Sequence, residues 1–168
     1  YIIGLIGLNE TVQTLIGKQL HESEEAHEMG KAIIARMYKN IQGFKKETGL
    51  TFTIEETPAE STTRKLAKGD RNHKKYGELA KKVVKGTEKD PYYTNSIHYA
   101  PDADVGLVDR IVGQSQYHEM IASGAIIHAY VGEKRPDKDY ILNVVKNTLE
   151  QTRCSQLVFS PTYTECDE

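Results

Sequence analysis

Hydrophobic residues along the chain recur with two alternating spacings, which predict strands and helices in turn. The first eight residues form a continuous apolar run, which is typical of a buried strand. From Ser23 to Gly49, apolar residues recur with the 3.6-residue period of an amphipathic helix. Acidic residues at its start and Lys45 and Lys46 at its end suit the helix dipole, and Gly49 is expected to end the helix.

The rest of the chain continues this alternation. The predicted extended segments are rich in β-branched and aromatic residues: 51–55, 92–99, 125–131 and 155–159. The predicted helices have helical spacing or a capping residue before them: 11–19, a helix beginning near 61, 76–85, 104–122 and 137–151. Because strands and helices alternate, we expect an α/β fold with a mostly parallel sheet or barrel.

The composition and charge limit the partners and the compartment that we expect for the chain. The 22 basic and 24 acidic side chains give a formal net charge of −2, so we expect neither a nucleic acid nor a membrane as a partner. No apolar run approaches the ~20 residues that span a bilayer. Cys154 and Cys166 are too few for a disulfide framework, which favours the reducing cytoplasm.

The segment from Phe52 to Lys65 combines a strand, a short loop and the start of a helix. Pro58 fixes the exit from the strand, and the small Ala59 allows a ligand to approach the backbone closely. Residues 61–63 place hydroxyl groups beside the free amides of a helix N-terminus, which attract phosphate. An ordinary capped helix has the same pattern, so the residues alone leave both interpretations open.

Four motifs together resemble the class III, glycyl-radical ribonucleotide reductases. Residues 53–62, Thr-Ile-Glu-Glu-Thr-Pro-Ala-Glu-Ser-Thr, resemble the strand and loop that hold the substrate phosphates in that family. The other three motifs resemble its upstream barrel strand, its Tyr-Thr-Asn-Ser segment and its Ser-Gly-Gly-x-Ile segment: residues 3–10, 92–98 and 123–126. Ala125 departs from the family pattern by replacing the second glycine. Each motif is weak by itself, but their order and spacing across the chain are specific.

The resemblance implies a fold and a reaction. The fold is part of the ten-stranded α/β barrel of the ribonucleotide reductase and pyruvate formate-lyase type, with residues 1–168 as a single segment truncated at both ends. The reaction is the anaerobic, radical conversion of ribonucleoside triphosphates to 2′-deoxyribonucleoside triphosphates. The expected site residues bind the substrate phosphates or line the substrate pocket: Thr57, Pro58, Ala59, Glu60, Ser61 and Thr62 for the phosphates, and Glu56 and Asn95 for the pocket.

The resemblance also implies machinery outside this chain. The family's thiyl cysteine lies on a finger loop upstream of Tyr1, and its glycyl radical lies beyond Glu168. We therefore expect no catalytic residue here and no activity from this segment alone. Cys166 resembles the first ligand of a structural zinc site, but one cysteine cannot hold the ion, so no cofactor is expected in this chain alone. A terminal cysteine without a role is the open alternative.

The expected partners follow from the complete enzyme. They are a ribonucleoside triphosphate, the remainder of the reductase barrel, a radical-SAM activating enzyme and a second copy of the complete enzyme. Unpaired strand edges should be covered by a partner chain or by self-association. A non-enzymatic nucleotide- or phosphate-binding α/β module is the alternative function. The flanking gene sequence would separate the two, because only the reductase has a cysteine loop before this segment and a zinc module after it.

Other reactive residues have simpler explanations. His21 and His27 lie six apart, so they do not share a helical face for a metal. We interpret His128 as a core histidine and Cys154 as a small buried hydrophobe. The basic residues between 64 and 85 form a solvated helix face or steer a triphosphate towards the protein.

Overall fold

The computed structural model describes residues 1–132 and 136–161. Its strands are β1 (Ile2–Leu5), β2 (Thr53–Glu56), β3 (Lys85–Gly86), β4 (Pro91–Tyr92), β5 (Ile127–Gly132) and β6 (Leu157–Pro161). Its helices are α1 (Leu8–Ile16), α2 (Glu24–Thr48), α3 (Glu60–Arg71), α4 (Gly77–Val83), α5 (Leu107–His118) and α6 (Lys138–Gln151). This mixture of helices and strands confirms the predicted α/β class.

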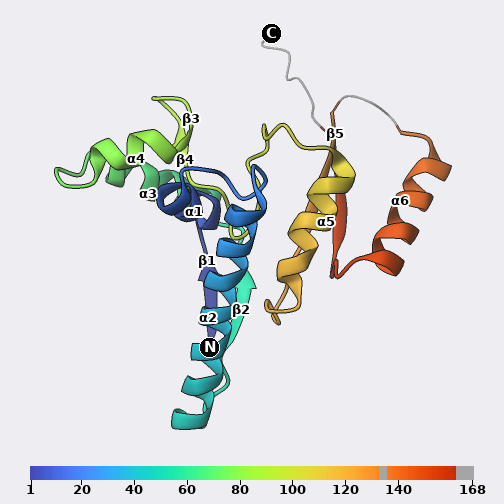
Figure 1. Cartoon of the computed structure of the whole chain (residues 1–168), viewed down its shortest axis with the longest axis horizontal. Helices are drawn as coiled ribbons and strands as arrows, with labels where there is room; N and C mark the ends of the chain where they lie inside the picture. The colour runs from blue at the N-terminus through green and yellow to red at the C-terminus, as the bar shows by residue number, and fades with distance from the viewer. Residues whose placement is uncertain (133–135, 162–168) are drawn as a thin grey trace.

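Two parallel strand pairs form the framework (Figure 1). β1 pairs with β2, with Ile3 opposite Ile54, and the chain crosses between them through α1 and α2. β5 pairs with β6, with Ala129 opposite Phe159, and α6 makes that crossover. Parallel strands need such long connections, which is the arrangement that the alternating pattern predicts. Within the described residues the strands form three two-stranded sheets, of which β3–β4 is a short antiparallel one.

The helix ends follow the capping residues. Ser23 caps α2, where its side chain accepts a hydrogen bond from the Ala26 amide, and Gly49 ends that helix at φ 72°. Asp137 caps α6 in the same way. α1 begins at Leu8, earlier than predicted, because Gly7 takes a left-handed conformation (φ 75°) and turns the chain out of β1. β1 is accordingly shorter than the predicted eight residues.

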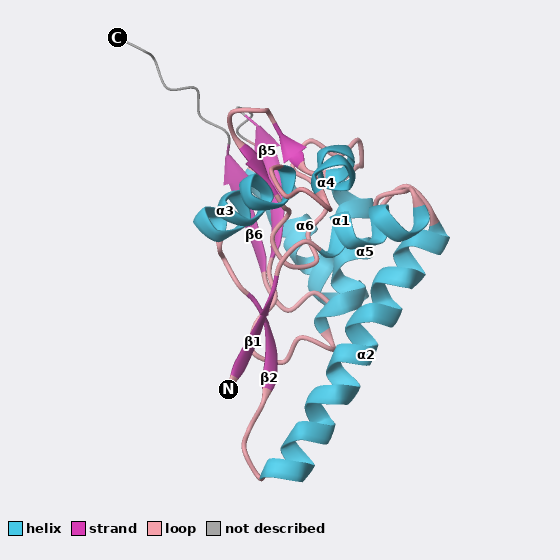
Figure 2. Ribbon diagram, turned by 90° about the vertical axis from the view of Figure 1, so that its left-hand side faces the viewer, coloured by secondary structure: helices cyan, strands magenta, loops and turns pink. Residues whose placement is uncertain are grey.

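The main core lies where α1, α2 and α5 meet β1 and β2. Val12, Ile34, Ile54 and Tyr117 are almost fully buried there. Figure 2 shows α2 running beside the β1–β2 pair along much of its length. A second cluster joins α5 to β5 through Ile111, Ile127 and Cys154, which confirms the prediction that Cys154 is a buried hydrophobe.

The segment 92–99 is not the extended run that its composition predicts. The strand β4 ends at Tyr92, and the following residues turn back towards β1. Ser96 adopts a left-handed conformation (φ 45°), and both its amide and its hydroxyl donate to the Leu5 carbonyl. An isolated antiparallel bridge also joins Ile6 to Asn95. Side-chain and backbone bonds to β1 therefore override the local strand preference.

Candidate functional site

A cavity of about 550 Å³ opens at the carboxyl end of β2. Its walls come from β2, the start of α3, the segment 92–99 and β5. Ligands of α/β folds characteristically occupy this end of the strands. The residues that line it are Glu56, Thr57, Pro58, Glu60, Thr63, Arg64, Tyr92, Tyr93, Thr94, Asn95, Ser96, His98, Tyr99, Pro101, Ile126, His128 and Tyr130.

The N-terminus of α3 has no side-chain cap. Ala59 occupies the capping position, and the first helical bond runs from the Thr63 amide to the Ala59 carbonyl. The Thr63 hydroxyl donates to the Glu60 carbonyl and so does not cap an amide either. The start of α3 thus differs from a helix start that is capped by a side chain. Backbone amides of the first turn remain available to a ligand.

Of the six residues predicted to bind phosphate, three line the cavity and three do not. Thr57, Pro58 and Glu60 line the cavity. Ser61 and Thr62 have exposed side chains in the first turn of α3, and with Ala59 they are not among the lining residues. Any role of these three in binding an anion falls to their backbone amides. This is the kind of contact that a helix N-terminus offers.

Two buried contacts hold the loop after β2 in place. The Thr57 amide donates to the Ser96 hydroxyl at 3.1 Å, and that hydroxyl donates to Leu5 at 3.1 Å. Gly4 on β1 faces the Thr57 side chain so closely that a Cβ there would collide with Thr57 Oγ1. Gly4 thus allows the loop to pack directly on β1. The loop is preorganised by residues far from it in sequence.

Glu56 is a buried carboxylate that lines the cavity. Its residue is only 8% exposed, whereas Glu55 is half-buried on the other face of β2. Glu56 Oε2 accepts a hydrogen bond from the Ile126 amide at 2.7 Å and lies 3.2 Å from His98 Nε2. Glu56 Oε1 is buried without a hydrogen-bond partner in the described part of the chain. Asn95, which also lines the cavity, likewise has its Oδ1 buried without a hydrogen-bond partner among the described residues.

Two histidines of this site were not predicted as site residues. His98 Nε2 contacts both Glu56 and the Ile126 carbonyl. His128 is half-buried, lines the cavity and bonds Ser160 Oγ at 3.0 Å through Nδ1. Burial and the nearby charge of His98 lower the pKa of His128. His128 is hydrogen-bonded, as the prediction of a core histidine requires, but it lies at the cavity wall and not in the core. The alternation of residues 126, 128 and 130 along one strand face was the signal that could have revealed it.

Arg110 supports the far wall of the cavity from α5. It is 5% exposed and donates to the carbonyls of Tyr99 and Ala100. Its guanidinium also lies over the rings of Tyr99 and Tyr130, at 5.9 and 5.6 Å from their centroids. Burial lowers its pKa. Arg110 thus holds two aromatic walls in position.

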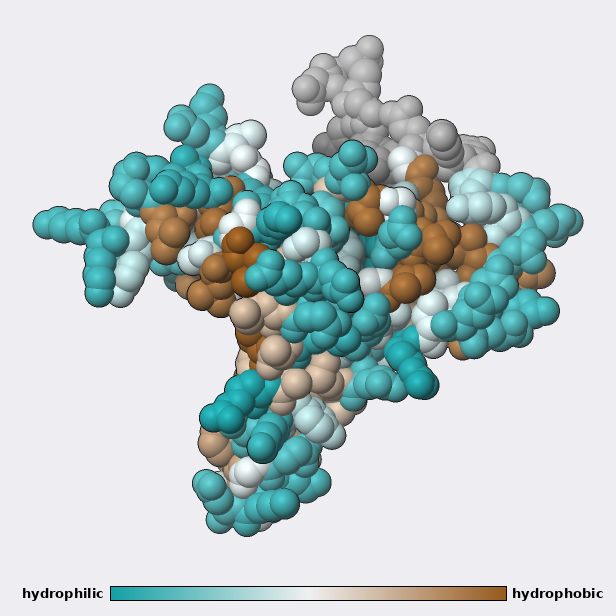
Figure 3. All heavy atoms as spheres, viewed as in Figure 1, coloured by the Kyte–Doolittle hydropathy of each residue, from teal (hydrophilic) through white to brown (hydrophobic). Residues whose placement is uncertain are grey.

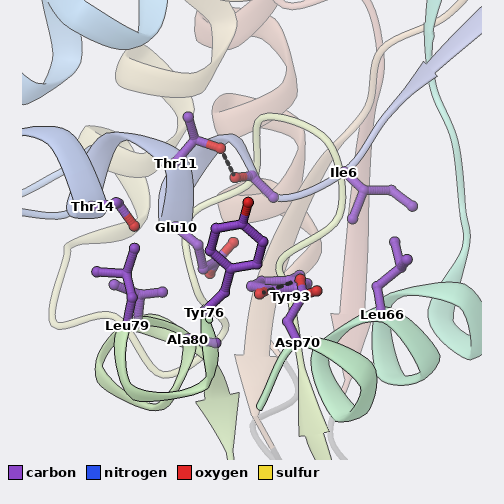
Figure 4. A pocket seen from close by; sticks show the side chains of 12 residues that line it. Ile6, Glu10, Thr11, Thr14, Leu66, Asp70, Tyr76, Leu79, Ala80 and Tyr93 are labelled. Atoms are coloured by element: carbon purple, nitrogen blue, oxygen red, sulfur yellow. Dashed lines mark hydrogen bonds between the residues drawn. The ribbon is translucent and has the colours of Figure 1, made fainter. Parts of the chain in front are cut away.

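A second cavity of about 380 Å³ lies between α1, α3 and α4 (Figure 4). Tyr93 lines both cavities, and its hydroxyl donates to Asp70 at 2.9 Å. The buried carboxylate of Glu10 accepts bonds from the amide and hydroxyl of Thr94, which ties α1 to the segment 92–99. Burial raises the pKa of Glu10. These two acids therefore brace one wall of the larger cavity.

Other candidate groups lie away from the cavity. His21 packs against Tyr99, and His27 packs edge-on against Tyr117. Within residues 1–132 and 136–161, no group of three or more His, Cys, Asp and Glu side chains is placed to hold a metal. Cys166, the predicted zinc ligand, lies outside the described residues. No described helix is both long enough and apolar enough to cross a membrane.

The comparison with protein families decides the assignment. A model of the family described as anaerobic ribonucleoside-triphosphate reductase matches residues 1–168. The chain belongs to this family. The resemblance seen in the four sequence motifs is thereby confirmed.

Curated relatives match the chain over a small share of their own length. An anaerobic ribonucleoside-triphosphate reductase of Salmonella typhimurium is 31% identical over 127 residues, which cover 75% of this chain and 17% of that protein. The enzyme of Haemophilus influenzae is 29% identical over 127 residues, which again cover 75% of this chain and 17% of that protein. The chain therefore spans about a sixth of the length of these curated relatives.

Solved structures support the fold. The anaerobic ribonucleotide reductase from Thermotoga maritima with MES in the active site is similar with a TM-score of 0.75. The match covers 99% of this chain and 26% of that one, at 23% identity. The same enzyme in complex with dATP and CTP gives a TM-score of 0.71 over 94% of this chain and 25% of that one, at 22% identity.

Proposed function

We propose that this chain supplies the substrate-phosphate side of the active-site pocket in an anaerobic reductase. That enzyme converts ribonucleoside triphosphates to their 2′-deoxy forms. The observation that carries the proposal is the uncapped N-terminus of α3 beside the 550 Å³ cavity. Free amides and the positive end of the helix dipole favour a phosphate group there. The reaction is inferred from membership of the anaerobic ribonucleoside-triphosphate reductase family.

The distribution of polar groups fits a nucleotide. The lining of the cavity includes hydrogen-bond donors, from the first turn of α3 and from Arg64, together with the carboxylate of Glu60. Glu56 Oε1 and Asn95 Oδ1 are acceptors without a hydrogen-bond partner among the described residues. A ribonucleoside triphosphate carries anionic oxygens at one end and ribose hydroxyl donors next to them. Glu56 and Asn95 are accordingly the residues that we propose for the ribose.

The radical chemistry belongs to other parts of the enzyme in this proposal. The glycyl radical, the thiyl cysteine and a structural zinc would be supplied outside the described residues, with Cys166 as one zinc ligand. The described residues bind and orient substrate and exclude water from it. The remaining barrel, a radical-SAM activating enzyme and a second enzyme copy are the proposed partners. A phosphate-binding module without catalysis is disfavoured by membership of the reductase family.

The first test is a calorimetric titration with ribonucleoside triphosphates, comparing wild type with Ser61→Pro. Ser61 is the second residue of α3, so its amide makes no bond within the helix. Proline there removes one free amide without breaking a helical hydrogen bond. We expect affinity to fall at least about tenfold, since a hydrogen bond to a charged group contributes about 1.5–3 kcal/mol.

Glu25→Pro is the matched control, because Glu25 is the second residue of α2 and does not line the cavity. Its affinity should equal that of wild type. Equal losses in both variants would point to helix destabilisation and not to a phosphate contact. If the folded wild-type chain binds no ribonucleoside triphosphate, the titration is repeated with the flanking segments restored. Absence of binding there would overturn the proposal.

A further inference from the structure

We propose that the ribonucleoside triphosphate enters this cavity as its complex with a divalent cation, and that the Glu60 carboxylate binds that cation. Mg²⁺ is the cation that suits a carboxylate and phosphate oxygens. The inference rests on the proposed function, since it concerns the same phosphate contact at α3. It also explains why an acidic residue lies where an anion is expected to bind.

Glu60 lies directly beside the backbone amides that are proposed to hold a phosphate. It is the first residue of α3 and it lines the cavity. No side chain caps this helix, so the Glu60 carboxylate does not accept a hydrogen bond from those amides. Arg64, one turn further along α3, pairs with Asp90 at 2.9 Å and forms no ion pair with Glu60. The exposed carboxylate of Glu60 is therefore available to a cation.

The cavity offers little positive charge to a triphosphate. Among the described residues that line it, Arg64 is the only lysine or arginine, and Asp90 already pairs with that side chain. Glu56 and Glu60 add two carboxylates to the same lining. Repulsion between like charges is stronger at a protein site than in bulk water. A triphosphate without a cation should therefore bind poorly here.

Both acids are placed to interact with what fills the cavity. Glu56 has only 4% of its side chain exposed, yet its Oε1 has no hydrogen-bond partner in the described part of the chain. Glu60 is close enough to His128 on β5 for its charge to oppose the effect of burial on the pKa of that histidine. Since His128 lies in the cavity wall, the Glu60 carboxylate is on the side of α3 that meets the cavity.

The described residues do not form a complete metal site by themselves. No group of three or more His, Cys, Asp and Glu side chains in residues 1–132 and 136–161 is placed to hold a metal. Proteins usually hold Mg²⁺ through one or two carboxylates together with substrate phosphates and water, and not in a cage of side chains. Glu60 beside a bound triphosphate supplies this set of ligands. The cation therefore binds together with the nucleotide.

Calorimetric titrations with CTP, in excess Mg²⁺ and in EDTA, measure the contribution of the cation. We expect the wild-type chain to bind at least about tenfold more tightly in Mg²⁺, the effect of one contact between charged groups. Glu60→Gln should change the two affinities in opposite directions. Binding in EDTA should become tighter because a repulsive charge is removed. Binding in Mg²⁺ should become weaker because the cation loses a ligand.

Glu55→Gln is the matched control, because Glu55 is half-buried on the other face of β2 and does not line the cavity. This variant should keep the wild-type dependence on Mg²⁺. Relaxation of water protons by Mn²⁺, used in place of Mg²⁺, detects the bound cation directly. The wild-type chain should enhance this relaxation when CTP is present, and Glu60→Gln should enhance it less.

Three outcomes would overturn the inference while CTP still binds and the proposed function stands. They are a wild-type affinity that is no tighter in Mg²⁺ than in EDTA, a Glu60→Gln variant that keeps the wild-type dependence on Mg²⁺, and a Glu60→Gln variant that loses affinity in both conditions. If the chain binds CTP in neither condition, even with its flanking segments restored, the proposed function fails and the inference fails with it.

Discussion

His118 lies buried near the cavity and illustrates how single residues respond to pH. It is 3% exposed, and Nδ1 accepts a hydrogen bond from the Ser155 amide at 2.9 Å. Nε2 is buried without a partner in the described part of the chain. Burial, which outweighs the opposing effect of Glu56, lowers the pKa of His118. The folded protein therefore holds this ring neutral.

The lowered pKa predicts that the protein loses stability in mild acid. Below the usual histidine pKa of about 6.5, the unfolded chain binds a proton that the folded chain resists. The free energy of unfolding should therefore be fully retained above pH 6.5 and should fall as the pH drops below it. Each such histidine contributes a slope of up to about 1.4 kcal/mol per pH unit. Urea denaturation between pH 7.5 and 5.5 measures this slope.

His118→Asn tests the assignment, because the asparagine oxygen can replace Nδ1 as the acceptor for Ser155. The variant should show a shallower slope than wild type. His21 and His128, whose pKa values are also lowered by burial, should account for what remains. Identical slopes in the two proteins would show that His118 titrates normally.

At the scale of elements, α2 packs closely against Leu20 and against Tyr117 of α5 because Gly30 has no side chain. A Cβ on Gly30 would lie 2.6 Å from Leu20 Cδ2 and 2.8 Å from Tyr117 Oη. Tyr117 is fully buried on α5, and its hydroxyl donates to the His27 carbonyl. Gly43, on the same helix, has open space around the corresponding position. One helix thus contains a tightly packed glycine and an unconstrained one.

These two glycines should respond to alanine in opposite directions. Gly43→Ala should stabilise the protein by about 0.5–1 kcal/mol, since alanine loses less backbone entropy in a helix. Gly30→Ala should destabilise it by about 1–3 kcal/mol, because overpacking must displace Leu20 or Tyr117. Thermal unfolding of both variants measures the difference. Stabilisation by both substitutions would contradict the tight contact between α2 and α5.

Elements that depend on local interactions were predicted better than segments that depend on residues distant in the sequence. Helices such as α2 and α6 depend on periodicity and on local caps at Ser23 and Asp137, and the sequence displays both. The segment 92–99 depends on Leu5 and Glu10, which lie more than 80 positions away. No local pattern carries that information. Its apparent strand character was therefore misleading.

The candidate site was predictable to a similar degree. The loop 57–62 followed from a strand, a proline and a helix start, all of which are adjacent in sequence. The pairing of Glu56 with His98 and Ile126 joins three distant segments and could not be anticipated. Glu56 was expected in the pocket only through the resemblance, because the local pattern does not show which face of β2 meets residues 123–126.

At the scale of the whole molecule, a large part of the apolar surface remains uncovered. Figure 3 shows apolar side chains gathered on the visible face over α3 and α4 and over α5 and β5. Leu142 and Leu149, seven residues apart on α6, are 64% and 58% exposed. Each parallel pair also has strand edges that no other described strand covers. Apolar surface and open edges of this kind characteristically mark contact regions.

This surface predicts that the chain by itself associates as its concentration rises. Sedimentation velocity should show the mean mass increasing with concentration, because association removes apolar side chains from water. Leu142→Lys with Leu149→Lys should weaken the association. Asn143→Lys with Asn147→Lys is the matched control, since it adds the same charge to exposed positions of the same helix. An equal effect of both pairs would attribute the change to charge repulsion. A wild-type monomer at every concentration would show that α6 and the strand edges need no cover.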